Sequence, residues 1–264
     1  MESWLGYLAI GAVVGVFAGM LGIGGGAIMV PLLVMLFEAQ GLPRTHLLHL
    51  AVGTAMATIL FTSIASVRAH AARGAIRWDI ARNITPGILV GGLAGSWIAS
   101  FIPPVVFAAL FTAVIYIAAT NLLLNRKPKP SRQPPGFAGM FVAGFLVSAL
   151  SAFAAVGGAF LTVPFMLWCN VPMLQAIGTA AVIGFPIALS STLGFVATGL
   201  NETGLPAYSV GFVFLPALAG IAAASVLMAP LGAAAAHRLP TLWLRRIFAG
   251  LFYVMATRML IGFL

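Results

Sequence analysis

The sequence predicts an all-α polytopic membrane protein made of two inverted-topology repeats, each with about five hydrophobic segments. Three observations support this prediction. Of the 264 residues, 62% are hydrophobic and only 6% are charged, whereas soluble globular proteins carry roughly 25% charged residues. Long uncharged runs provide one to three membrane crossings each, and the landmarks of the first half recur in the second. Apart from one short linker, no soluble domain is expected.

The two halves share three landmarks in the same order. The stretch GIGGGAIMVPLL at 22–33 aligns with AVGGAFLTVPFM at 155–166, and AVGTAMA at 51–57 aligns with AIGTAAV at 176–182. Pro86 in TPGILVGGLAGS also aligns with Pro216 in LPALAGIAAAS. Three ordered landmarks rarely arise by chance, so they predict an internal duplication. Its parts are an N-terminal transmembrane repeat, a basic proline-rich cytoplasmic linker and a C-terminal transmembrane repeat, at 1–124, 125–136 and 137–264.

Each half divides into five hydrophobic segments. In the first half they cover about 4–21, 25–37, 45–68, 83–101 and 104–124, and in the second about 137–154, 159–169, 173–199, 208–229 and 241–263. The second segment of each half is too short for an ordinary crossing. It forms either a re-entrant hairpin with the first segment or a broken, tilted span. Both arrangements leave an odd number of crossings per half, which predicts opposite orientations for the two repeats.

The positive charges agree with this topology. Eleven of the 13 Arg and Lys residues fall on one side of the predicted fold, whereas Glu2, Glu38 and Glu202 fall on the other. By the positive-inside rule, we expect the basic loops in the cytoplasm and both termini outside, in a cell (inner) membrane. The net charge of +9 is therefore an orientation signal and not a nucleic-acid signature. Only Glu2 precedes the first apolar run, so no cleavable signal peptide is expected.

Glycine-rich motifs mark one part of the candidate substrate site. In transporters with inverted repeats, discontinuous helices present unpaired N–H groups near the midplane, where the helix dipole favours an anion. The alternative is close helix packing through small residues, which is common in membranes. A nucleotide loop is disfavoured, because no Lys-Ser or Lys-Thr follows and no strand precedes. The predicted breaks comprise Gly24, Gly25 and Gly26 in the first half and Gly157 and Gly158 in the second.

Hydroxyl groups form the second part of the candidate site. Threonine and serine recur every four residues along 54–66, which places them as a slowly drifting stripe on one face of a helix. Such hydroxyls either donate hydrogen bonds to a small oxyanion or bond to their own helix backbone. A glycine–threonine pair occurs at matching positions of the two halves. The predicted substrate-binding residues here are Gly53, Thr54, Thr58, Ser66, Gly178, Thr179 and Ser191.

Few ionisable side chains are available inside the predicted membrane region. His49 and His70 are candidates for proton coupling, although histidines at an interface are often simply solvated. All four acidic residues lie at segment ends or in loops, so no buried carboxylate relay is expected. Asp79, near Arg77 and Arg82, is expected to form a loop ion pair or a helix cap. One cysteine without a carboxylate cluster is a poor ligand set, so no metal site and no cofactor are expected.

The GxGGGxxxVPxL block, the repeated A[VI]GTA block and the RxxAxRGAIRWDIA loop together resemble the sulfite exporter TauE/SafE family of membrane transporters. The resemblance covers nearly the whole chain. It implies transport of small sulfur-containing anions such as sulfite, sulfonates or sulfoacetate. Ala55 and Ala180 stand where relatives often have serine, and Ala155 and Ala159 flank a reduced second glycine block. The resemblance carries over to Gly22, Gly24, Gly25, Gly26, Pro31, Gly53, Thr54, Gly157, Gly158, Pro164, Gly178 and Thr179.

The sequence thus predicts a secondary transporter of a small sulfur-containing anion that works by alternating access between the two repeats. Its partners are the anion and the lipid bilayer, with no nucleic acid, and a homo-oligomer is left open. A passive anion channel that uses the same residues is the main alternative. An intramembrane lipid-processing enzyme would need a carboxylate, histidine or serine constellation at depth. The absence of intramembrane acids argues against it, so no enzymatic activity is expected.

Overall fold

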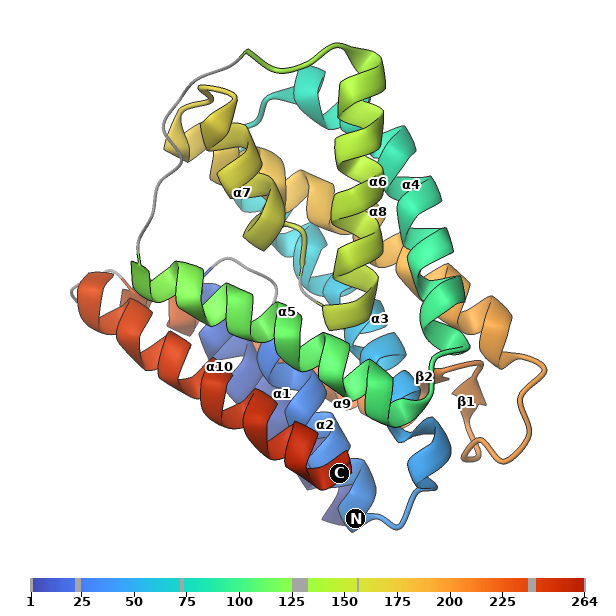
Figure 1. The fold of residues 1–264 in the computed structure, drawn as a ribbon. Helices are drawn as coiled ribbons and strands as arrows, with labels where there is room; N and C mark the ends of the chain where they lie inside the picture. Colours follow the sequence, from blue (N-terminus) through green and yellow to red (C-terminus); the bar gives the residue numbers. More distant parts are fainter. Residues whose placement is uncertain are drawn as a thin grey trace.

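The computed structural model describes residues 2–21, 25–71, 74–124, 133–155, 157–236 and 241–263 (Figure 1). Helices make up nearly all of this part of the chain. The first half contains α1 (Glu2–Leu21), α2 (Gly26–Ala39), α3 (Arg44–Ala71), α4 (Trp78–Ser100) and α5 (Pro104–Leu124). The second half contains α6 (Phe137–Ala154), α7 (Ala159–Trp168), α8 (Met173–Gly199), α9 (Leu215–Ala236) and α10 (Thr241–Phe263). A short antiparallel hairpin of β1 (Ser209–Val210) and β2 (Val213–Phe214) precedes α9.

Six stretches of helix within the described residues are long and apolar enough to cross a membrane: Arg44–Arg68, Pro104–Leu124, Phe137–Ala154, Met173–Gly199, Leu215–Gly232 and Arg246–Phe263. The helices that follow the glycine motifs are shorter, with 14 residues in α2 and 10 in α7. Large apolar side chains such as Trp97, Phe101 and Leu227 are exposed on the outside, as a lipid environment requires. The predicted class, an all-α polytopic membrane protein with short helices at the glycine motifs, is confirmed.

Two helices begin at positions other than those expected. The α4 helix begins at Trp78 and not near 83, because its charged first turn is helical although it interrupts the apolar run. The α9 helix begins at Leu215 and not near 208, because residues 209–214 form the hairpin. Gly211 allows the hairpin turn with a φ of 55°. Its backbone also lies against α8, where a Cβ would be only 2.3 Å from the carbonyl oxygen of Val196.

The first helix of each half packs against the fourth helix of the other half, so that α1 lies on α9 and α6 lies on α4. Small residues make this close approach possible. Gly87, Gly91 and Gly95 of α4 are one turn apart and face the α6 backbone between Phe141 and Ala149. A Cβ on these glycines would approach that backbone to 2.0, 2.2 and 2.7 Å, respectively. The glycine spacing is visible in the sequence, but its packing role was not predicted from it.

The helices α5 and α10 pack along one side of the molecule (Figure 1). Thr112 Oγ1 donates a hydrogen bond to the carbonyl of Ala256, 3.3 Å away. About two turns further along α5, the hydroxyls of Thr120 and Tyr253 are bonded. The residue numbers of the bonded partners therefore increase along α5 while they decrease along α10, so the two helices run antiparallel.

Candidate substrate site

The helices α3 and α8 form an antiparallel pair at the centre of the fold. Near the start of α3, Gly53 lies beside Phe195, and near the start of α8, Gly178 lies against Ala75, which follows the end of α3. The two ends of the pair are named here the Phe214 end and the Arg77 end. The 17 positions from Gly178 to Phe195 correspond to about 25 Å of helix. The two glycine–threonine pairs therefore lie too far apart to contact the same small anion.

At the Arg77 end, Gly178 and Thr179 hold the loop between α3 and α4. The Ala75 carbonyl rests on Gly178, where a Cβ would lie 2.0 Å from its oxygen. Two residues later, the backbone N–H of Arg77 donates a hydrogen bond to Thr179 Oγ1, 2.9 Å away. Thr179 is fully buried, and its hydroxyl binds the N–H of the residue that precedes α4. We call this arrangement the Thr179 contact.

At the Phe214 end, Gly53 and Thr54 hold the hairpin between α8 and α9 in the same way. The Phe212 carbonyl rests on Gly53, where a Cβ would lie 2.3 Å from its oxygen. Two residues later, the N–H of Phe214 donates to Thr54 Oγ1, 3.0 Å away. We call this arrangement the Thr54 contact. It matches the Thr179 contact position by position, with a carbonyl on the glycine and an N–H on the threonine. In each case a pair from one half holds a loop of the other half.

The two glycine breaks meet inside the molecule. Gly25 caps the start of α2 in the left-handed conformation, with a φ of 67°. Gly26 lies directly against the segment between α6 and α7, and a Cβ would come within 1.8 Å of the carbonyl oxygen of Ala155. Ala155 is itself left-handed, with a φ of 47°, and is fully buried. Gly22 and Gly24 lie outside the described residues.

The breaks lie near the middle of the central helix pair. Gly158 faces α8, where a Cβ would be 2.3 Å from the Cδ1 of Ile187. Ile187 is nine positions after Gly178 and eight before Phe195. The structure therefore brings the two breaks together about halfway between the Thr54 and Thr179 contacts. It does not bring the glycine–threonine pairs to the breaks.

Both short helices begin at this meeting point. In α2, the N–H groups of Ile28 and Met29 return to the carbonyl of Gly25. In α7, the N–H groups of Leu161 and Thr162 return to the carbonyl of Gly158. The Phe160 N–H also donates to the carbonyl of Gly157, 3.4 Å away. The N–H groups of Gly26 and Ala27 in α2 and of Ala159 in α7 have no intrahelical acceptor. They carry the positive end of the helix dipole and so favour an anion.

The other predicted hydroxyls have different surroundings. Thr58 is fully buried and donates to the carbonyl of Thr54, 2.9 Å away, so it bonds to its own helix. Ser66 lies further along α3 towards the Arg77 end and is partly exposed. Ser191 is fully buried in α8, and its hydroxyl has no hydrogen-bond partner among the described residues.

His49 is buried near the Phe214 end. Its side chain is 3% exposed, and its ring lies 5.1 Å from that of Phe107 and 5.2 Å from that of Phe212. Its Nε2 lies 3.1 Å from the carbonyl oxygen of Ala99. Since a carbonyl only accepts hydrogen bonds, Nε2 carries the proton and His49 links α3 to the end of α4. His70 lies in the last turn of α3 and is partly exposed.

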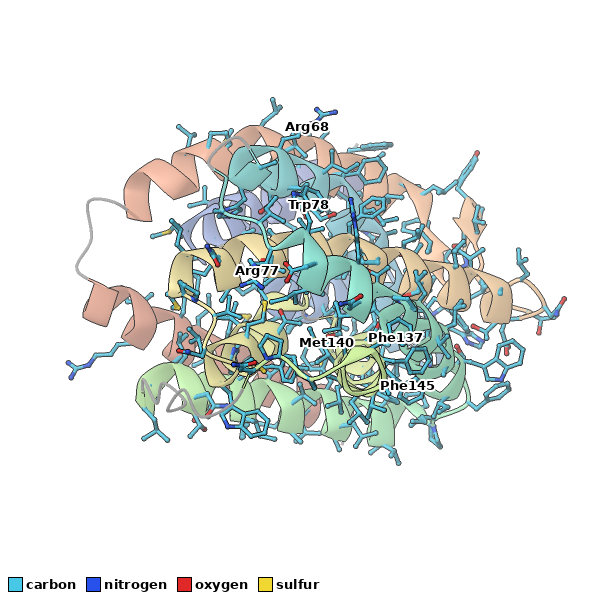
Figure 2. The ribbon with its side chains drawn as sticks, turned by 90° about the horizontal axis from the view of Figure 1, so that it is seen from above. Arg68, Arg77, Trp78, Phe137, Met140 and Phe145 are labelled. Atoms are coloured by element: carbon cyan, nitrogen blue, oxygen red, sulfur yellow. The ribbon has the colours of Figure 1, made fainter. Side chains whose placement is uncertain are left out.

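The Arg77 end carries charged and aromatic groups. Figure 2 looks onto this end, with Arg68, Arg77 and Trp78 from the α3–α4 region and Phe137 and Met140 from the start of α6. The Arg77 guanidinium donates two hydrogen bonds to the Asp79 carboxylate, over 2.9 and 2.6 Å, which confirms the predicted ion pair. These hydrogen bonds lower the pKa of the Asp79 carboxyl below its usual value. The pair is exposed to solvent, so it contributes little to stability.

The sequence-based prediction of the site omits two serines of α6. Ser148 and Ser151 are buried, and neither hydroxyl has a hydrogen-bond partner among the described residues. They are the only polar side chains in α6. Two hydroxyls three positions apart in an otherwise apolar helix share one face, and this spacing was the signal that could have identified them.

Six apolar stretches of spanning length, together with two short helices that begin at a common central point, define a polytopic α-helical membrane protein. Residues 7–259 match the model of the family described as sulfite exporter TauE/SafE, and the chain belongs to this family. A Haemophilus influenzae protein named "probable membrane transporter protein" is 32% identical over 253 residues, which cover 96% of each chain.

More distant relatives carry the same printed description. A Methanocaldococcus jannaschii protein is 24% identical over 262 residues, covering 96% of this chain and 94% of its own. A Bacillus subtilis protein is 23% identical over 195 residues, covering 71% of this chain and 77% of its own. Both are named as probable membrane transporter proteins. No solved structure matches the chain.

Proposed function

We propose that this chain is a secondary transporter of a small sulfur-containing anion of the sulfite, sulfonate or sulfoacetate type, and not an enzyme. It works by alternating access between two inverted repeats. One observation carries the proposal: Gly26 meets Ala155, so that two helix starts converge midway between the Thr54 and Thr179 contacts. A central anion site with a releasable contact on either side is what alternating access requires.

Helix directions and packing support the inverted repeats. The corresponding helices α3 and α8 run antiparallel, and so do α5 and α10. The pairing of α1 with α9 corresponds to that of α6 with α4. The Arg77 end also carries Arg68, Arg77 and Arg82, which makes it the cytoplasmic end by the positive-inside rule. Both termini then face outward in the cell membrane. The predicted basic linker at 125–136, of which 125–132 lie outside the described residues, is then cytoplasmic.

The absence of charged side chains at the two glycine breaks supports a small anion of low charge as the substrate. Neither 3–37 nor 133–201 contains an Asp, Glu, Lys, Arg or His residue, so the breaks carry no charged side chain. Their attraction for an anion comes from N–H groups and helix dipoles. Such partial charges stabilise one negative charge more easily than two, because the cost of desolvating an ion rises steeply with its charge. A monovalent sulfonate or hydrogensulfite therefore fits this centre better than a divalent anion such as sulfate or sulfoacetate.

Ten of the twelve predicted substrate-binding residues then divide into two groups, and Thr58 and Ser66 belong to neither. Gly24, Gly25, Gly26, Gly157 and Gly158, with Ser191, belong to the central substrate site. Gly53, Thr54, Gly178 and Thr179 hold the loops that close the Phe214 and Arg77 ends, and they act on the substrate through those loops.

Flux measurements on reconstituted protein test the proposal. The purified protein in liposomes should take up radiolabelled sulfite with saturation and should show counterflow when the vesicles are preloaded with unlabelled anion. Flux that does not saturate and shows no counterflow would identify a passive channel instead. If sulfite, sulfonates and sulfoacetate all fail to cross faster than in empty liposomes, the proposed substrate class is wrong.

A further inference from the structure

The buried hydroxyls of the two halves differ in their hydrogen bonding. In α3, the side chains of Thr58, Thr62 and Ser63 all donate to carbonyls of their own helix. In α6 and α8, three serines that are at most 1% exposed have no hydrogen-bond partner among the described residues: Ser148, Ser151 and Ser191. An unpaired buried hydroxyl is costly, and the interior of a membrane offers no bulk water to pair it. These serines therefore call for a physical explanation.

Ser151 is placed beside the first glycine break. It lies four positions before Ala155, so the two residues share a face at the end of α6. The Ala155 carbonyl is the group that Gly26 touches. Ser151 is thus one helical turn from the residue whose carbonyl contacts the start of α2.

Ser191 is placed beside the second glycine break. It lies four positions after Ile187 in α8, again on the same face. The Ile187 side chain is the group that Gly158 touches, just before the start of α7. The Ser191 hydroxyl is thus also one turn from a contact with a break. Ser148 differs, because it lies against Gly92 of α4.

We infer that the hydroxyls of Ser151 and Ser191 bind the oxygens of the transported anion at the glycine breaks. This inference rests on the proposed function and adds that the hydroxyl donors come from the C-terminal half alone. When the anion is bound, each hydroxyl donates to one of its oxygens, beside the N–H groups of the helix starts. When the site is empty, the hydroxyls are unpaired, which favours binding. Thr58 and Thr62 of α3 bond to their own backbone, and Thr54 binds the Phe214 N–H, so these threonines take no part.

Serine-to-alanine variants test the inference against a matched control. Ser151→Ala and Ser191→Ala each remove one unpaired hydroxyl. Ser190→Ala removes the neighbouring hydroxyl of α8, which bonds to the Pro186 carbonyl of its own helix, 2.8 Å away. Sulfite affinity is measured in detergent by the anion-dependent rise in melting temperature, and sulfite flux is measured in liposomes.

The expected result is a selective loss of affinity. Because a hydrogen bond to a charged group is strong, Ser151→Ala and Ser191→Ala should each weaken sulfite binding about tenfold or more. Ser190→Ala should keep the affinity of the unchanged protein. Without anion, the two test variants should melt no lower than the unchanged protein, since a methyl group replaces an unpaired hydroxyl. If either alanine variant does not fold, the Ser→Cys variant, with nearly the same shape and a weak donor, replaces it.

Three negative results are possible, and they have different meanings. If the unchanged protein binds and transports sulfite and the test variants match Ser190→Ala, the inference is overturned while the proposed function stands. A lowered melting temperature without anion, at unchanged affinity, would likewise give the serines a structural role and overturn the inference. If the unchanged protein shows neither an anion-dependent rise in melting temperature nor flux with any of the sulfur anions, the proposed function itself fails.

Discussion

The hydroxyl oxygen of Thr54 accepts a hydrogen bond from the backbone N–H of Phe214, although the two residues are 160 positions apart. The same bond joins Thr179 to Arg77 at the opposite end of the α3–α8 pair. Each threonine follows a glycine whose missing side chain admits a carbonyl from the same loop. The repeated A[VI]GTA block is thus a backbone-recognition motif that connects the two halves at both ends.

Loss of either hydroxyl should loosen one end of the protein. Thr54→Val and Thr179→Val keep the side-chain shape but leave the N–H of Phe214 or Arg77 without its partner, which costs about 1–3 kcal/mol. We expect a lower melting temperature and reduced sulfite flux for both variants. Thr62→Val is the matched control, because Thr62 bonds only to its own helix and is partly exposed. Flux in both test variants equal to that of Thr62→Val would contradict a role for these contacts in transport.

A methyl group at the central break should disrupt transport. In Gly26→Ala, the new Cβ would fall 1.8 Å from the Ala155 carbonyl oxygen, so α2 must move away from the segment between α6 and α7. We expect flux to fall to background while helix content in circular dichroism is kept. Gly184→Ala in α8 is the control, since a Cβ there meets nothing within 4 Å. Normal flux in Gly26→Ala would show that the two breaks need not touch.

The glycine row of α4 should govern stability. In Gly91→Ala, the Cβ would approach the Phe145 carbonyl oxygen to 2.2 Å and force α4 and α6 apart. Overpacking of this kind costs about 1–3 kcal/mol, which a thermal melt of the purified protein would record. Gly250→Ala in α10 meets nothing within 4 Å and should be neutral or slightly stabilising. Equal melting temperatures of the two variants would rule out tight packing between α4 and α6.

Selectivity should follow the charge of the anion. Because the residues around the breaks carry no charged side chain, partial charges must stabilise the whole charge of the anion. We expect a short alkanesulfonate, which has one negative charge, to compete with labelled sulfite for uptake, and sulfate to compete poorly. If sulfate competed with sulfite more strongly than the alkanesulfonate does, the result would indicate a cationic group at the site and would contradict a neutral centre.

The sequence by itself determined the class of protein, the order of the helices and the places where they break. Apolar run lengths and glycine motifs are local properties, and they predicted the short helices α2 and α7 as well as the spanning ones. Local signals also misplaced the starts of α4 and α9, because a charged helical turn and a β-hairpin are not distinguished by apolar length. The ion pair of Arg77 with Asp79 could be predicted because its members are two positions apart.

The tertiary structure decided which of these features meet. The glycine–threonine pairs and the glycine breaks were predicted to form one site, yet packing puts the pairs at opposite ends and the breaks in the middle. Only the fold shows that Thr58 has a backbone partner while Ser151 and Ser191 have none. The physical reason is that a hydroxyl's hydrogen bond depends on which backbone lies next to it. Thr58 finds that backbone in its own helix, whereas the partners of Thr54 and Thr179 are brought there by a different part of the chain.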